Sequence, residues 1–256
     1  MNFFFGIKDN QINCEVQIPL FQNKSLKLVN YNLYSIFPNN GLWEINKIND
    51  AKNSEFFIIK NNEISNDKIF FIAKDKDLIE YDSSKLQNFN SYTDTTPAYR
   101  ANLKIDINEG GFSSYQSEYP FEMAVKNGSI LSPINTLLDK TADKNYVFIK
   151  NIFVDPISKE FDLFLINFKE RKVIKKYLIK KNFMNKIEID KLYIDPEVYL
   201  FTKDYLGVPI FVNIKDKHIS FEHTHPPHEY ILSEDKFKLV NNVKRKFNEI
   251  ILQENN

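Results

Sequence analysis

The chain of 256 residues contains a single cysteine, Cys14, which excludes a fold held together by intramolecular disulfide bonds. Lys plus Arg and Asp plus Glu are equal at 34 each, so overall charge gives no reason to expect a nucleic acid or an anionic membrane as partner. No apolar run approaches the roughly 18 residues that a membrane-spanning helix needs, and the first residues lack the pattern of a signal peptide. These absences predict a cytoplasmic protein that contacts no membrane.

The motifs of several large enzyme classes are also absent. The sequence contains no G-x-G-x-x-G, Walker A, H-E-x-x-H or G-x-S-x-G pattern. Dinucleotide binding, P-loop phosphate binding, zincin chemistry and α/β-hydrolase chemistry therefore lack support. Any function has to be argued from local groups of unusual residues.

Short β-type runs separated by polar turns dominate the chain. Residues 99–107 alternate between apolar and polar side chains, as in a strand with one buried face, whereas FDLFLINF (161–168) is apolar on both faces, as in a central strand. Further strands are expected at 197–201, 208–214 and 218–224. The pattern predicts a mainly β fold with antiparallel sandwich- or barrel-like sheets.

Local signals predict two helices and one hairpin. Ser132-Pro133 has the residues of a helix start, which predicts a short internal helix. The runs FFII (56–59) and IFFI (69–72) flank a turn-rich stretch and predict a β-hairpin. A C-terminal amphipathic helix is predicted by apolar residues spaced by three or four positions, namely Phe237, Val240, Val243, Phe247 and Ile250.

The segment DSSKLQNFNSYTDTTP (82–97) is polar and poor in aliphatic residues, which predicts an exposed linker. It divides the chain into an N-terminal β lobe, residues 1–95, and a C-terminal β-sandwich lobe with the terminal helix, residues 96–256. A single continuous β domain is the alternative, because one β architecture of this length is also reasonable.

All four histidines fall within eleven positions, at 218, 223, 225 and 228. In an extended strand, Ile219 and Phe221 would point to the core and His223 and His225 would continue that row at the strand end. Proline has no N–H to donate, so Pro226-Pro227 then ends the strand. Glu222 would lie on the opposite face. We predict His223 and His225 as catalytic or binding residues.

The same cluster is also compatible with a zinc-like divalent metal ion. Its ligands would be His223, His225, His228 and Glu229, which supply the imidazole and carboxylate donors that such ions take. The spacing H-x-H-x-x-x-E resembles the first half of the cupin metal motif over seven residues. No histidine follows to complete the ligand set, so the family is not assigned.

The stretch GGFSSYQSEYPF (110–121) mixes aromatic rings with hydroxyl, amide and carboxylate groups. Neither face of this segment, read as a strand, is apolar enough to be buried in a core. Such mixtures suit sugars, because rings stack on C–H faces while polar groups bond the hydroxyls. The predicted ligand-binding residues are Arg100, Ser114, Tyr115, Gln116 and Tyr119.

Three functions follow from these patterns. The leading hypothesis is a site for a small polar, carbohydrate-like ligand, in which Glu118 and the imidazoles form an acid–base pair if the site is catalytic. The alternatives are a metal-dependent hydrolase or isomerase, and a structural or interaction protein whose histidines only pack. The leading hypothesis requires His223 and His225 to meet Tyr115, Gln116 and Glu118 in space, with Arg100 beside them.

Overall fold

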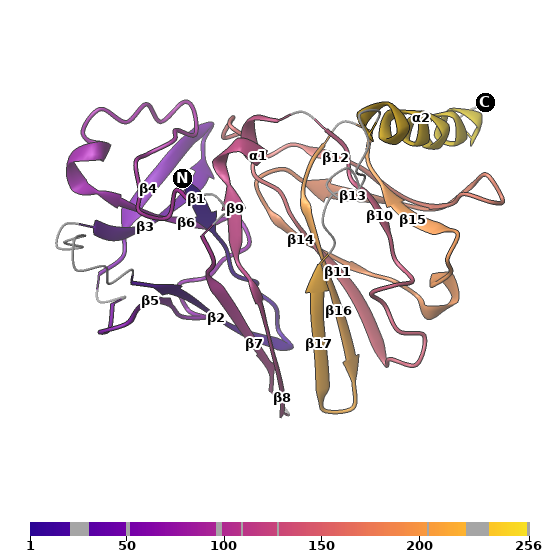
Figure 1. Cartoon of the computed structure of the whole chain (residues 1–256), viewed down its shortest axis with the longest axis horizontal. Helices are drawn as coiled ribbons and strands as arrows, with labels where there is room; N and C mark the ends of the chain where they lie inside the picture. The colour runs from indigo at the N-terminus through magenta and orange to yellow at the C-terminus, as the bar shows by residue number, and fades with distance from the viewer. Residues whose placement is uncertain are drawn as a thin grey trace.

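The computed structural model describes residues 1–20, 31–49, 52–95, 99–108, 110–126, 128–203, 205–223 and 236–254. Four antiparallel sheets contain most of the regular structure (Figure 1), which confirms the mainly β prediction. The predicted C-terminal helix is also present. Within the described residues, no helix is both long and apolar enough to cross a membrane.

The N-terminal lobe consists of two sheets, with strand orders β4-β3-β6-β1-β9 and β5-β2-β7-β8. A 3-10 helix, η2 (Asp75–Leu78), follows β6, and a short α-helix, α1 (Phe121–Val125), follows β9. The strands are β1 (Asn2–Phe4), β2 (Ile12–Pro19), β3 (Tyr31–Asn39), β4 (Leu42–Lys47), β5 (Phe56–Ile59), β6 (Ile69–Lys74), β7 (Asn102–Ile107), β8 (Gly110–Gln116) and β9 (Glu118–Pro120).

The C-terminal lobe also has two sheets, with strand orders β10-β15-β12-β13 and β14-β11-β16-β17. Its helices are the 3-10 helix η3 (Lys191–Tyr193) and the C-terminal α2 (Lys236–Glu254). The strands are β10 (Leu131–Pro133), β11 (Lys144–Lys150), β12 (Glu160–Asn167), β13 (Lys172–Lys180), β14 (Met184–Glu188), β15 (Val198–Phe201), β16 (Val208–Lys215) and β17 (His218–His223).

Strand β11 is buried on both faces, because the cores of both lobes pack against it. Val147 and Ile149 pack in the core of the C-terminal lobe, whereas Tyr146 and Phe148, on the other face of the same strand, belong to the core of the N-terminal lobe. Helix α2 covers the outer face of the β12 sheet through Phe247, Ile250 and Ile251. Buried contacts thus continue from one lobe into the other.

The predicted helix at Ser132-Pro133 is wrong. These residues belong to β10, an edge strand that pairs with β15, and a single turn follows, in which Leu138 N–H donates to Ile134 O. Proline is tolerated on an edge strand because no neighbour needs its missing N–H. The short internal helix of the fold is instead α1, which begins directly after Pro120.

The predicted hairpin between residues 56–59 and 69–72 is also wrong. Strand β5 pairs with β2, whereas β6 pairs with β3 and β1 in the other sheet of the lobe. Ile64, between them, is buried in the core. The connection therefore crosses from one sheet to the other and does not turn back on itself.

Residues 82–95 of the expected linker are packed against both lobes. Leu86 and Phe89 are buried, and the Leu86 N–H donates to Val154 O at 2.8 Å. The strands after this segment still pair with the N-terminal lobe: β7 with β2, β8 with β7, and β9 with β1. The change from one pair of sheets to the other thus falls after β9, not near residue 95.

Candidate functional site

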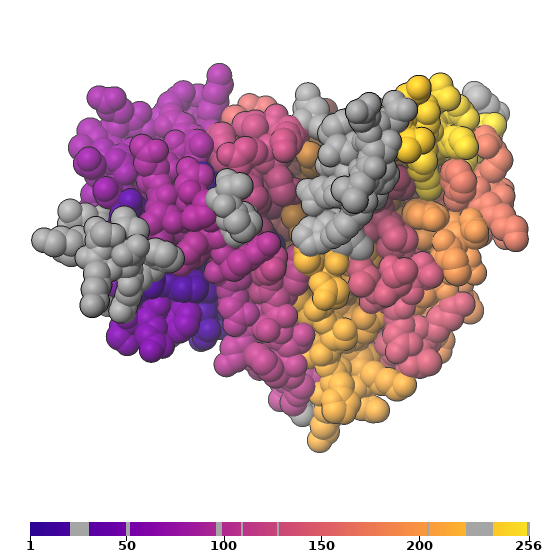
Figure 2. Space-filling model, viewed as in Figure 1, coloured from indigo at the N-terminus to yellow at the C-terminus, as the bar shows by residue number. Residues whose placement is uncertain are grey.

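Two edge strands from different lobes, β8 and β17, lie side by side (Figure 1). The hairpins that contain them also adjoin on the molecular surface (Figure 2). Gly111, at the start of β8, has φ +77°, and a Cβ on it would lie 2.3 Å from the carbonyl oxygen of Lys217 in the β16–β17 turn. Only glycine combines this backbone angle with so close an approach, so Gly111 sets the spacing of the two strands.

The two stretches singled out in the sequence meet at Tyr115 and His223. Their ring centroids are 4.6 Å apart with an interplanar angle of 68°, and Tyr115 also packs against Phe221 at 5.4 Å. Ile219 and Phe221 are buried, as the strand pattern predicted, and His223 follows them with 15% of its side chain exposed. Strand β17 thus places an imidazole against a tyrosine ring from the other lobe.

A chain of polar contacts lies beside these rings. The Nη1 of Arg100 donates to Oε1 of Gln116 and to Oε1 of Glu118. The Arg100 side chain is 53% exposed, whereas that of Glu118 is only 5% exposed. Burial raises the pKa of Glu118 above its ordinary value, and Arg100 partly offsets this rise. The second oxygen, Oε2, is buried and has no hydrogen-bond partner among the described residues.

Glu222 lies on the exposed face of β17, opposite to Phe221 and His223, as strand alternation predicted, but its carboxylate still reaches this group. Its Oε1 lies 3.0 Å from Nδ1 of His223 and accepts the His223 N–H at 2.9 Å. The side chain curls back to its neighbour in sequence, which a pattern of alternating faces does not capture. Burial raises the pKa of the Tyr115 hydroxyl, the carboxylates of Glu118 and Glu222 raise it further, and Arg100 lowers it.

We call this group the junction site. Its members come from β8, β9, β17 and the loop before β7: Arg100, Tyr115, Gln116, Glu118, Glu222 and His223. They combine an exposed guanidinium, two carboxylates, an amide, a phenol and an imidazole. Such a set can donate and accept hydrogen bonds and can present ring faces.

Two predicted ligand-binding residues have other positions. Ser114 is exposed on β8, on the strand face opposite to Tyr115. Tyr119 is fully buried, and its hydroxyl lies 3.4 Å from both the N–H and the carbonyl oxygen of Ile152, so it links the lobes. Ser117, from the same row, is buried with its hydroxyl bonded to the backbone of Phe5. Ser117 and Tyr119 can therefore be buried although they carry hydroxyl groups, because backbone groups of Phe5 and Ile152 satisfy those hydroxyls.

The proposed metal ligands are only partly described. His225, His228 and Glu229 lie outside the described residues. His218 is exposed at the opposite end of β17 from His223. In the part of the chain that the structure describes, no three His, Cys, Asp or Glu side chains are grouped as a metal site would require.

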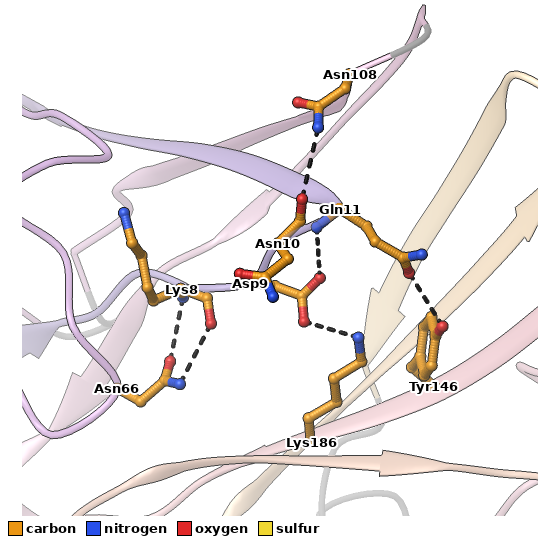
Figure 3. Close-up of polar contacts among 8 residues, drawn as sticks. All are labelled: Lys8, Asp9, Asn10, Gln11, Asn66, Asn108, Tyr146 and Lys186. Atoms are coloured by element: carbon orange, nitrogen blue, oxygen red, sulfur yellow. Dashed lines mark hydrogen bonds and ion pairs between the residues drawn. The ribbon is translucent and has the colours of Figure 1, made fainter.

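Polar contacts near the start of β2 also join the lobes (Figure 3). The Nζ of Lys186 lies 2.7 Å from Oδ2 of Asp9 and 3.9 Å from the ring centroid of Tyr146. The Tyr146 hydroxyl donates to Oε1 of Gln11 at 3.1 Å. These contacts hold β11 and β14 against the N-terminal lobe, and with them the sheet that carries β17.

A fully buried lysine in the same interface was missed in the sequence. Lys150 ends β11 and donates from Nζ to the carbonyl oxygens of Asn66 at 3.2 Å and Lys68 at 3.3 Å. Strand alternation was the signal in the sequence that could have indicated this burial. In an extended strand, Lys150 lies on the same face as Tyr146 and Phe148.

No protein-family model, curated protein or solved structure matches this chain.

Proposed function

We propose that the junction site binds a small polar, carbohydrate-like ligand. The observation that carries this proposal is the contact of the Tyr115 and His223 rings at 4.6 Å, directly beside the polar groups of Arg100, Gln116 and Glu118. Aromatic faces next to fixed hydrogen-bonding groups suit the alternating C–H and O–H surfaces of a sugar. Two lobes contribute, so the ligand would contact residues more than 100 positions apart in sequence.

The half-exposed Arg100 supports a ligand of this kind. One of its nitrogens contacts Gln116 and Glu118, while 53% of the side chain is accessible to solvent. A guanidinium carries five N–H donors, so donors remain for ligand hydroxyls. Glu222, which is 58% exposed, adds acceptor oxygens at the same place.

A thermal-shift screen with neutral, amino and acidic sugars tests the proposal. A ligand that binds only the native state raises the melting temperature in a concentration-dependent way. We expect at least one sugar to stabilise the wild-type protein, and His223→Ala to abolish this shift. His218→Ala is the matched control, because it removes an exposed histidine from the same strand. A screen without any shift, or an equal loss in both variants, would refute the proposal.

A further inference from the structure

Three aromatic side chains from separate segments of the C-terminal lobe pack against one another, apart from the junction site. Phe153 follows β11, Phe161 lies in β12, and Tyr205 lies between β15 and β16. The ring of Phe153 stands at 86° to the rings of both Phe161 and Tyr205, with centroids 6.3 and 5.7 Å away. Phe161 is buried and packs against Tyr205, with ring centroids 4.1 Å apart. Phe153 and Tyr205 thus form two walls of a right-angled corner, which we call the aromatic corner.

The ammonium of Lys181 occupies this corner. Its Nζ lies over both rings, 4.9 Å from the centroid of Phe153 and 4.6 Å from that of Tyr205. Both distances fall within the roughly 6 Å over which a ring face attracts a cation. Within the described part of the chain, Lys181 forms no ion pair with a carboxylate. The corner therefore holds a positive charge by its ring faces.

A comparison with Lys186 separates this arrangement from a purely structural contact. Lys186 also lies over two rings, those of Tyr146 and Phe148. Its ammonium is paired with Asp9 of the other lobe at 2.7 Å, so it joins the lobes. Lys181 has no such link, and its side chain is only partly buried.

The walls of the corner are fixed by hydrogen bonds of their backbone. The Phe153 N–H donates to Oδ1 of Asn182 at 2.7 Å. The carbonyl oxygen of Tyr205 accepts from the Ile130 N–H at 3.2 Å and from the Thr202 hydroxyl at 2.7 Å. Both rings pack at the edge of the lobe's core and remain partly exposed. A corner formed in advance loses little conformational freedom when a cation binds to it.

Lys181 is a weak occupant of such a corner. A lysine ammonium is strongly hydrated, so contact with ring faces costs part of its hydration. A quaternary ammonium has no N–H group to hydrate, and aromatic faces are the groups that recognise it in proteins. The backbone of Lys181 is held separately, because its N–H donates to the Lys159 carbonyl oxygen at 2.9 Å. The side chain can therefore turn outward to solvent while the turn between β13 and β14 stays in place.

We propose that the aromatic corner is a binding site for a quaternary or methylated ammonium group, which displaces Lys181. The cation of the ligand takes the place of Nζ between Phe153 and Tyr205. The ammonium of Lys181 is the internal competitor of the ligand. This site is separate from the junction site and does not depend on the function proposed there.

NMR titration observed on the methyl signal of choline tests the proposal, with 3,3-dimethyl-1-butanol as the neutral analogue of the same shape. We expect the wild-type protein to bind choline and not the analogue. Lys181→Ala should bind choline about tenfold more tightly than the wild type, because the competing ammonium is gone. Lys175→Ala is the matched control, since Lys175 lies over one ring only, that of Tyr177 at 5.0 Å. It should bind choline like the wild type.

Removing a wall of the corner should abolish the binding. Tyr205→Leu and Phe153→Leu are each combined with Lys181→Ala, and circular dichroism shows which of them fold. A folded variant of either kind should no longer bind choline. Equal affinity of the wild type and Lys181→Ala, equal binding of the neutral analogue, or retained binding without a wall would each overturn the proposal. Binding by Lys181→Ala but not by the wild type would also overturn it, because the lysine would then close the corner permanently.

Discussion

Lys150 is a charged side chain that the fold buries completely between its two lobes. Its ammonium contacts two backbone carbonyl oxygens and, among the described residues, forms no ion pair within contact distance. Burial lowers the pKa of Lys150 from its ordinary value of 10.5 to about 7, and the charge of Asp67 partly offsets this effect. An ammonium removed from water in this way destabilises the folded state relative to the unfolded chain.

The first prediction concerns the pH dependence that Lys150 confers. Its pKa is lower in the folded state, so the unfolded chain binds more protons between pH 7 and 10.5, and stability should rise with pH across that range. Between pH 7 and 9 this contribution is roughly 2 kcal/mol. We expect Lys150→Met to remove this rise. Urea denaturation at pH 7 and 9 measures it, and an identical pH response of both proteins would contradict the prediction.

A second prediction compares Ser114, in β8, with Ser117, which directly follows that strand. Ser117 is buried, and its hydroxyl accepts the Phe5 N–H at 3.0 Å and donates to the Phe5 carbonyl oxygen. Ser117→Ala leaves the Phe5 carbonyl oxygen without this donor, whereas the Phe5 N–H keeps its bond to the Ser117 carbonyl oxygen at 3.2 Å. The variant should lower the free energy of unfolding by about 1–3 kcal/mol. Ser114→Ala, at an exposed position, should change it by less than about 0.5 kcal/mol. Equal effects in chemical denaturation would show that the buried hydroxyl has no special role.

At the scale of elements, the packing of β8 against β17 depends on Gly111. Gly111→Ala would force a Cβ to 2.3 Å from the Lys217 carbonyl oxygen, in addition to the cost of a positive φ. Gly41→Ala is the matched control, because Gly41 has φ +79° and a Cβ on it would have nothing within 4 Å. We expect the control to cost about 1–2 kcal/mol and Gly111→Ala to cost more, as measured by chemical denaturation.

The same glycine variant should also separate the two strands of the junction site. Gly111→Ala is therefore expected to weaken sugar binding, whereas Gly41→Ala should leave it unchanged. Calorimetric titration of both folded variants measures this difference. If Gly111→Ala binds like the wild type, the spacing of β8 and β17 does not control the site.

Local patterns were sufficient to predict many strands. The apolar run 161–168 became β12, which is central because it pairs with both β13 and β15. The pairing of distant segments was not predictable in the same way. Nothing near β5 and β6 indicates that Ile64 is buried between their two sheets, so the expected hairpin was wrong. Polar composition likewise failed to distinguish a linker from a segment held by hydrogen bonds.

The junction site was predictable only in outline. Alternation along β17 placed Ile219, Phe221 and His223 on one face. The contact of His223 with Tyr115 was expected because sites in β folds are often formed where the ends of strands lie together. Glu222 was missed because its carboxylate bends back to the neighbouring ring. The full burial of Tyr119 was missed because its partner, the backbone of Ile152, is supplied by the other lobe.

At the scale of the whole molecule, the two lobes share one buried core. Residues of β11 and β16 in the C-terminal lobe, such as Phe148 and Val212, belong to the same cluster as Phe3 and Phe70 of the N-terminal lobe. The Trp43 indole N–H adds a bond to Val154 O at 2.8 Å. Separate unfolding of either lobe would expose this surface, which couples the lobes thermodynamically.

We therefore predict a single cooperative transition in calorimetric unfolding, with agreement between the calorimetric and van't Hoff enthalpies. Fluorescence of Trp43 should report the same midpoint as far-UV circular dichroism, because its ring is buried where the lobes meet. Two resolved transitions, or different midpoints for the two probes, would mean that the lobes unfold independently.

The central claim is that a polar ligand binds where β8 meets β17, and histidine NMR tests it most directly. The protein is labelled with ¹³C in its histidine rings and titrated with D-glucosamine, D-glucose and D-glucuronate, with signals assigned through His223→Gln and His218→Gln. The account predicts that the His223 signal shifts in a saturable way with at least one of these sugars, because its ring contacts Tyr115, while the distant His218 signal stays unchanged. Saturation that shifts His218 but not His223, or no saturable shift with any of the three sugars, would contradict it.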